Sequence, residues 1–177
     1  MPVAFEVAQE LGAVLDLIAV RKLGVPFQQE LAMGALGEDG VLVRNDAVLQ
    51  RLGLDADQLA EAAQRELPRL QRQAELRGGR DRVPLGGRTV IVVDDGVATG
   101  ATARAACAVA RAQGAVEVVL STPVAPPEVY TRFDGVADAV VCVLTPKDFM
   151  GVGQFYRDFA PTSDAEVTRL LHAARSS

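Results

Sequence analysis

The stretch from Thr89 to Thr102, Thr-Val-Ile-Val-Val-Asp-Asp-Gly-Val-Ala-Thr-Gly-Ala-Thr, constrains the fold more than any other part of the chain. Its four consecutive β-branched residues, Val90 to Val93, lack polar alternation, which is typical of a strand buried on both faces of a parallel sheet. Two carboxylates, Asp94 and Asp95, follow the strand. The apolar run Ala101 to Ala112 then predicts a helix. The stretch therefore predicts a strand, a short loop and a helix N-terminus.

Such a loop suits a phosphate group, because it points backbone N–H groups and the positive end of the helix dipole outward. Thr99 and Thr102 add hydroxyl donors, and either could cap the helix. The two carboxylates cannot serve the same anion, because like charges repel, so they must face hydroxyl groups, a cation or a developing positive charge one sugar's length away. A ribose 5-phosphate fits both ends. An ordinary turn with two solvated aspartates is the alternative that the spacing leaves open.

Residues 90–102 resemble the motif with which type I phosphoribosyltransferases bind 5-phosphoribosyl 1-pyrophosphate (PRPP): an apolar strand, two acidic residues, small residues, then Thr-Gly-x-Thr. The resemblance implies that Asp94 and Asp95 are catalytic and hold the ribose hydroxyls. The residues that it implies for binding the 5-phosphate are Val97, Ala98, Thr99, Gly100, Ala101 and Thr102. Mg²⁺ is the implied cofactor. PRPP would carry the ion, and Asp94 and Asp95 are its candidate protein ligands.

A second candidate group is the pair Arg21 and Lys22, which follows a predicted buried strand, Val14 to Val20. The pair resembles the start of the family's mobile catalytic loop, where two cations can neutralise pyrophosphate as it leaves. A surface Arg-Lys pair on an ordinary hairpin is the alternative. Only two of the 18 basic residues are lysines, Lys22 and Lys147, so each points weakly to a position that needs a compact ammonium group.

The N-terminal segment, Pro2 to Gly12, predicts a helix with proline in its first turn and glycine at its end. Similar sequences carry a first strand and a pyrophosphate-binding loop ahead of this helix, whereas Met1 stands here where that loop would end. The expectation is therefore that the first strand is missing, by truncation or by loss of the loop. Truncation is favoured, because loss of a central strand would leave a gap in the sheet.

The rest of the chain alternates between helical and strand patterns. Asn45 to Arg77 is predicted to be helical with a break at 53–55, where Asp55 can cap the second part. The predicted later strands are Val116 to Leu120, before a turn at 122–127, and Ala139 to Leu144. This order predicts an α/β fold, a parallel twisted sheet flanked by helices, in a single domain over residues 1–177. The residues expected at its ligand-binding edge are Arg21, Asp94, Ser121 and Thr145.

The aromatic tail after Thr145 resembles the hood of purine phosphoribosyltransferases, placed at approximately residues 145–177. The resemblance implies that Phe149 stacks on a flat base and that Asp158 helps to close the site. The alternative is that these aromatic residues pack a C-terminal helix, 164–174, onto the sheet. Two departures leave the acceptor base open: Ala98 replaces an acidic residue of the hypoxanthine-guanine enzymes, and no lysine occurs at 121–122.

The composition, with 49% hydrophobic residues and a net charge of −5, indicates a soluble globular protein. No apolar run is long enough for a membrane span and no signal peptide is evident, so the cytoplasm is the expected location. The acidic balance argues against a nucleic-acid partner. A single histidine, His172, is too few for a Ser-His-Asp triad or a His-rich zinc site. Cys107 and Cys142 are predicted to be small buried hydrophobic residues. A basic segment before the strand at 90–93 is predicted to be a solvated loop or a guide for phosphate groups, and its arginines are Arg77, Arg80, Arg82 and Arg88.

The expected function is transfer of a 5-phosphoribosyl group from PRPP to a nitrogenous base, purine-like or other, with release of pyrophosphate. The implied partners are PRPP, pyrophosphate and a base, and the family expectation is a homodimer. Two further hypotheses stay open. One is a non-catalytic PRPP or nucleotide sensor on the same fold, which would not need a pyrophosphate loop. The other is that the chain is one part of a larger protein fused to a hydrolase.

Overall fold

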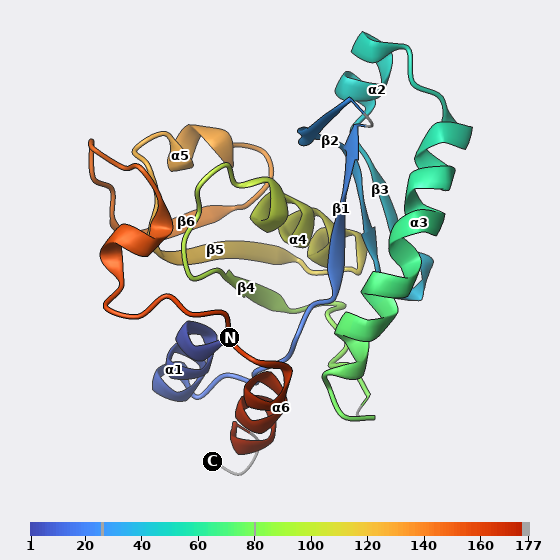
Figure 1. Ribbon diagram of the computed structural model, residues 1–177. Helices are drawn as coiled ribbons and strands as arrows, with labels where there is room; N and C mark the ends of the chain where they lie inside the picture. The colour runs from blue at the N-terminus through green and yellow to red at the C-terminus, as the bar shows by residue number, and fades with distance from the viewer. Residues whose placement is uncertain (26, 80, 175–177) are drawn as a thin grey trace.

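The computed structural model describes residues 1–25, 27–79 and 81–174, which form two three-stranded sheets with helices around them (Figure 1). The strands are β1 (Val20–Val25), β2 (Gln28–Gly37), β3 (Leu42–Arg44), β4 (Thr89–Val93), β5 (Glu117–Val124) and β6 (Ala139–Leu144). The helices are α1 (Pro2–Leu11), α2 (Asp46–Leu52), α3 (Ala56–Glu75), α4 (Ala101–Ala112), α5 (Val129–Arg132) and α6 (Asp164–Ala173), with 3₁₀ turns η1 (Glu38–Gly40) and η2 (Val152–Phe155).

One sheet is parallel, with β5 between β4 and β6. The predicted strands at 90–93 and 139–144 are confirmed, but the predicted burial of β4 on both faces is wrong, since Ile91 is 36% exposed. β5 continues through the predicted turn to Val124. Ser121 therefore lies inside β5 and not at its end, but it pairs with Val93, the last residue of β4, and so stays beside Asp94. The strand continues because the chain beyond β4 pairs with it: the N–H groups of Asp94 and Val97 donate to the carbonyls of Ser121 and Val124, each at 3.0 Å.

The other sheet is antiparallel, in the order β1-β2-β3. The strand predicted from Val14 to Val20 is wrong, because only Val20 lies in a strand. The backbone before it is held by side chains instead of a ladder: the N–H of Ala19 donates to Glu38, and the carbonyl of Leu17 accepts from Arg77. Within the described residues, no ladder joins the two sheets.

Helix α4 packs against both sheets and so connects them (Figure 1). Its buried small residues, Ala103, Ala106 and Ala110 among them, share one core cluster with Val92 and Leu120 of the parallel sheet and with Val20 and Ala35 of the antiparallel one. The approach is close, since a Cβ atom added to Gly37 would lie 2.4 Å from Cγ1 of Val109. The alanine-rich sequence after Gly100 thus allows one helix to serve two sheets.

The outer face of the antiparallel sheet is covered by α2 and α3 (Figure 1). The predicted break between them is confirmed, with Gly53 in the left-handed region at φ 64°. Asp55 caps α3 as predicted, in a capping box with Gln58. Leu59 and Leu70 of α3 lie in the same core cluster as Leu23 of β1.

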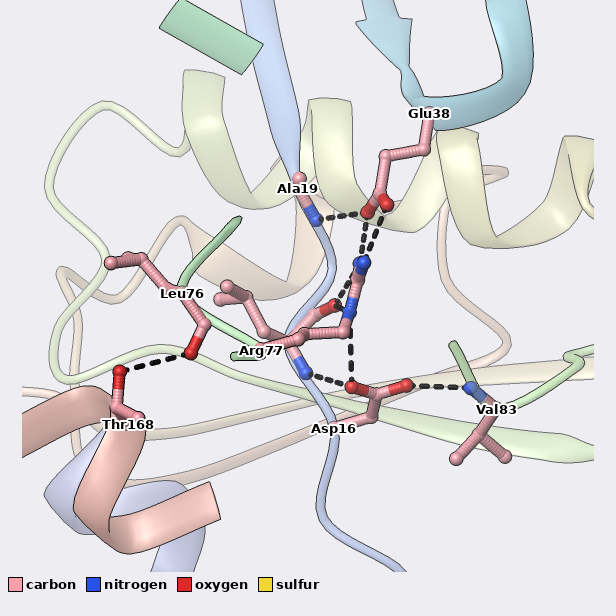
Figure 2. A network of polar contacts seen from close by, with 8 residues as sticks. Asp16, Ala19, Glu38, Leu76, Arg77, Val83 and Thr168 are labelled. Atoms are coloured by element: carbon pink, nitrogen blue, oxygen red, sulfur yellow. Dashed lines mark hydrogen bonds and ion pairs between the residues drawn. The ribbon is translucent and has the colours of Figure 1, made fainter. Parts of the chain in front are cut away.

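A buried polar network holds the segment before β1 to the chain after α3 (Figure 2). Arg77, 6% exposed, donates to Glu38 and to the carbonyl of Leu17, and its Nε lies 3.2 Å from Oδ1 of Asp16. Asp16 also accepts from the N–H of Val83 at 2.7 Å. Arg77 is therefore buried and paired, and the predicted solvated loop is wrong there. Arg80 lies outside the described residues.

The ends of the described chain pack together, α1 against α6 (Figure 1). Ala8 and Leu15 share a small core cluster with Val167 and Leu171, and Ser163 caps α6. The predicted helices at 2–12 and 164–174 are confirmed, while the alternative in which aromatic residues dock α6 onto the sheet is wrong, because α6 packs on α1. In the part of the chain that the structure describes, no helix has the length and apolar character for a membrane crossing.

Candidate functional site

The acidic pair stands where β4 ends. Asp94 is half-buried and Asp95 exposed. Burial, a hydrogen bond with Asp95 and the charge of Asp95 together raise the pKa of Asp94 to about 6, against the backbone N–H groups of Asp95 and Gly96, which lower it. Two adjacent carboxyl groups form an arrangement that a cation, hydroxyl donors or a nearby positive charge would stabilise.

The loop after the pair turns directly into α4. Val97 is buried, and Gly100, at φ 78°, is the residue before the helix. No side chain caps α4; Oγ1 of Thr99 accepts a long hydrogen bond, 3.4 Å, from the N–H of Ala101, and Thr102 is exposed. The predicted threonine cap is therefore only partly realised, by Thr99. The first turn of α4 thus presents backbone N–H groups toward the loop, which is the arrangement that favours an anion.

Arginines from two helices brace this loop from one side. Arg132 of α5 donates to the carbonyl of Ala98 at 2.8 Å, and Arg104 of α4 donates to the carbonyl of Arg132. The guanidinium of Arg104 also lies 5.9 Å from the centre of the Phe133 ring. A Cβ atom added to Gly100 would be 3.1 Å from that same buried ring, so a larger residue there would displace the loop or Phe133.

A cleft of about 540 Å³ opens beside the loop. It combines loop backbone, a carboxylate, two cationic groups and an aromatic ring, and its lining residues are Ala98, Thr99, Pro126, Pro127, Glu128, Arg132, Lys147 and Phe149. Three separate segments therefore meet at this cleft: the loop after β4, the start of α5 and the chain after β6. It has the size and the mixed polarity of a small-molecule site.

The predicted hood residues separate in the structure. Phe149 lines the cleft and its ring stacks on that of Phe155, with centroids 6.0 Å apart and planes at 8°. Asp158 is exposed, and its carboxylate accepts from the N–H of Ala160 in its own turn. The structure thus brings Phe149 to the cleft, while the described contact of Asp158 is local.

Arg21 and Lys22 do not end a strand, contrary to the prediction, because both lie inside β1, paired with Leu36 and Ala35. β1 continues beyond the pair to Val25 and β2 begins at Gln28, so most of the residues expected in a loop after Lys22 lie in strands, while Pro26 lies outside the described residues. Arg21 forms an ion pair with Glu66 of α3, Nε to Oε2 at 3.3 Å. The structure therefore holds Arg21 against α3.

Several cleft residues were not predicted from the sequence. Arg132 and Glu128 lie in an ordinary-looking helical stretch, and only the tertiary fold brings them beside Ala98 and Thr99. Lys147 carried a weak signal, as one of two lysines among many arginines, and it lines the cleft.

The described residues contain no group of three or more His, Cys, Asp or Glu side chains that could hold a metal ion. The acidic pair offers hard oxygen ligands at the end of β4. Two carboxylates fit Mg²⁺ when the ion keeps water and substrate phosphates as its other ligands. Cys107 and Cys142 are free thiols, the first fully buried, where burial raises its pKa to about 11.

Two curated proteins are similar to this chain over nearly its whole length. The chain is 57% identical over 175 residues to "Putative phosphoribosyl transferase Rv0571c" of Mycobacterium tuberculosis strain H37Rv, and equally to "Putative phosphoribosyl transferase MT0597" of strain CDC 1551. These matches cover 98% of this chain but 40% of each relative, so the chain spans less than half the length of these curated relatives. No protein-family model matches the chain.

A solved structure is similar over nearly the whole chain. The crystal structure of TT1426 from Thermus thermophilus superposes with a TM-score of 0.88 at 42% sequence identity, covering 96% of this chain and 80% of that one. Likeness of this extent shows that the two proteins share their fold.

Proposed function

Since this chain belongs to one family with TT1426 of Thermus thermophilus, and its curated relatives carry phosphoribosyl transferase names, we propose that it transfers a 5-phosphoribosyl group from PRPP to a nitrogenous base. Pyrophosphate leaves C1 of the ribose, and a nitrogen of the base forms the new bond to C1. The acceptor base is not assigned by the names of the relatives.

The observation that carries the proposal is the arrangement around the loop of residues 94–102. The acidic pair, in which the pKa of Asp94 is raised, lies at one end, and a helix N-terminus without a side-chain cap lies at the other. The cleft beside Ala98 and Thr99 provides room for a flat acceptor next to Phe149. A sugar phosphate placed along this loop would put its anion at the helix and its hydroxyls at the carboxylates.

In this proposal, each part of the loop has one task. Asp94 and Asp95 accept hydrogen bonds from the ribose hydroxyls and offset the positive charge that develops at C1 as pyrophosphate departs. The backbone from Val97 to Thr102 binds the 5-phosphate. Phe149 contacts the base. Arg21 and Lys22 remain candidates for neutralising the leaving group, and Asp158 for closing the site.

Mg²⁺ is part of the proposal through the acidic pair. Asp94 and Asp95 are the described residues whose oxygen atoms would hold it, together with the phosphates of PRPP. When bound, the ion supplies charge neutralisation for the departing pyrophosphate. The ion would then favour the ionised form of Asp94 at neutral pH, since a neighbouring cation lowers the pKa of a carboxyl group.

A second candidate, a PRPP or nucleotide sensor without turnover, is favoured by one observation. Arg21 pairs with Glu66 of α3, whereas a leaving-group residue must be available to pyrophosphate. The sensor would use the same phosphate loop and acidic pair. The hypothesis that the chain is one part of a larger protein is supported by the length of the curated relatives, of which the matches cover 40%.

Two measurements test the proposal. PRPP consumption with Mg²⁺ across a panel of free bases is expected to show turnover with at least one of them. Calorimetric titration of PRPP and Mg²⁺ into the protein is expected to show binding. Binding without turnover on any base favours the sensor, and absence of binding rejects both.

A further inference from the structure

The hood contacts the acidic loop directly. Oη of Tyr156 donates a hydrogen bond to the backbone carbonyl of Asp95 at 2.5 Å. Val152 of η2 packs on the neighbouring backbone, where a Cβ atom added to Gly96 would lie 2.2 Å from Cγ1 of Val152. One hydroxyl and one isopropyl group thus hold the peptide units that follow the acidic pair.

The hood is ordered so that it presents these two groups together. The side chain of Gln154 accepts from the N–H groups of Met150 and Gly151, at 2.8 and 3.1 Å, which fixes the start of η2. The Tyr156 ring packs on Phe159 with centroids 5.2 Å apart. The tyrosine ring is therefore held by packing, and only its hydroxyl reaches the acidic loop.

The same short segment also forms the acceptor side of the cleft. Phe149, which lines the cleft, stacks on Phe155, and Phe155 directly precedes Tyr156 in the chain. Residues 149–156 therefore contact both the cleft and the backbone of Asp95. Segments that touch both halves of a site can couple them.

On these contacts we propose that Tyr156 and Val152 are positioning residues for the acidic pair. They hold the backbone of Asp95 and Gly96, which sets the direction of the two carboxylates, and they tie that direction to the Phe149 side of the cleft. The inference rests on the proposed function, because it assigns the acidic pair to PRPP. Tyr156 acts through the carbonyl of Asp95 and not through a reacting atom.

Tyr156→Phe tests the hydroxyl while keeping the ring contact with Phe159. Tyr130→Phe is the matched control, because Tyr130 of α5 is the other tyrosine and is 49% exposed. Two readouts are compared: amide hydrogen exchange of residues 95–97 in the protein without ligand, and the Kd for PRPP with Mg²⁺ by calorimetry. We expect Tyr156→Phe to speed exchange at Gly96 and to raise the Kd about tenfold, the scale of one hydrogen bond. Tyr130→Phe should change neither by more than about twofold.

Gly96→Ala and Val152→Gly test the packing contact in a double-mutant cycle. Alanine at 96 collides with Val152, so Gly96→Ala alone should weaken PRPP binding more than it does in the Val152→Gly background. Thermal unfolding confirms that each variant is folded. Additive effects would overturn the role of Val152.

The outcomes separate this inference from the proposed function. If amide exchange at residues 95–97 is unchanged in Tyr156→Phe, the Tyr156 hydrogen bond does not constrain this backbone, whatever the Kd for PRPP. Faster exchange with a wild-type Kd rejects the positioning role while the proposed function stands. If the wild-type protein does not bind PRPP, the proposed function fails and the positioning role fails with it.

Discussion

Two clusters of charged side chains in this molecule are built in opposite ways. Asp16, Glu38 and Arg77 combine both signs in a buried network that joins three distant segments (Figure 2). Asp94 and Asp95 combine one sign in adjacent residues at a strand end. Burial alone would lower the pKa of Arg77, but hydrogen bonds and charges from Glu38 and Asp16 raise it above its ordinary value. The pKa of Asp94 rises instead because burial and Asp95 both oppose its charge.

The difference separates a structural charge cluster from a candidate functional one. In the first, each charge has its partner within the fold, so the network needs nothing further. In the second, two like charges oppose each other, and a partner from outside the chain would relieve them. Local electrostatic repulsion of this kind is a reason to expect a ligand.

The largest expected effect on stability comes from breaking the buried network of Asp16, Glu38 and Arg77. Arg77→Ala leaves the carboxylates of Asp16 and Glu38, with side chains 16% and 14% exposed, without their cation. Removing one partner of a buried ion pair costs about 3–5 kcal/mol in the free energy of unfolding. Urea unfolding followed by circular dichroism measures it.

Arg72→Ala is the control for this measurement, because Arg72 lies exposed in the last turn of α3. Its cost should stay within about 0.5 kcal/mol. Equal losses in the two variants would contradict the assignment of Arg77 to a stabilising network.

The next effect concerns the acidic pair. Asp95→Asn removes a charge that offsets the developing positive charge on ribose, so turnover should fall by about 10² or more. The free energy of unfolding should not fall, in contrast to Arg77→Ala, because the change relieves a like-charge contact. Steady-state PRPP turnover and urea unfolding on the same variant give both numbers. Unchanged turnover would rule out the catalytic role.

The sequence predicted the local structure around Asp94 and Asp95 better than the network around Arg77. Asp94 and Asp95 follow a strand whose β-branched run is a local pattern, so the strand, the loop and α4 were predictable from one contiguous stretch, residues 89–112. The Arg77 network joins residues 16, 38 and 77, and no local pattern indicates that a loop arginine will be buried between two distant carboxylates.

The same limit explains the errors around β1. The apolar run at 14–20 has strand character, but its backbone groups bond to side chains of the Arg77 network, so the strand starts only at Val20. Periodicity cannot report such a competition. The cleft side of the site was likewise only partly predicted, because Arg132 and Lys147 reach the loop through the packing of α5 and β6.

A smaller effect is expected from Asp94→Asn, and it depends on pH. The folded-state pKa of about 6 lies above the ordinary value of 3.8, so the native state binds more protons between those values and its stability falls as pH rises through them. At pH 7 the ionised carboxyl therefore destabilises the fold, and Asn should raise the free energy of unfolding by roughly 1–2 kcal/mol. Below about pH 4 the wild-type protein and the Asp94→Asn variant both carry an uncharged group at position 94, so the gain in the free energy of unfolding should vanish.

Urea unfolding at pH 4 and pH 7 checks the sign of this change. Asp134→Asn, at an exposed position, is the control and should show no such pH-dependent gain. A loss of stability at pH 7 in Asp94→Asn would show that the acidic pair is compensated within the fold after all.

The smallest effect on stability is expected at the ion pair of Arg21 and Glu66. It combines both signs of charge, as the Arg77 network does, but it is more exposed to solvent. The pair is of opposite sign, but its side chains are 35% and 25% exposed, so solvent screens it and either Arg21→Gln or Glu66→Gln should cost less than about 1 kcal/mol. Turnover distinguishes the two uses of Arg21. If Arg21 neutralises pyrophosphate, Arg21→Gln should lower kcat at least tenfold, while Glu66→Gln, which keeps the cation and removes its tether, should not. Equal, small effects of both variants on kcat would show that Arg21 is a structural ion-pair partner of Glu66, like Arg77 with Asp16 and Glu38. That result would favour the sensor over the transferase.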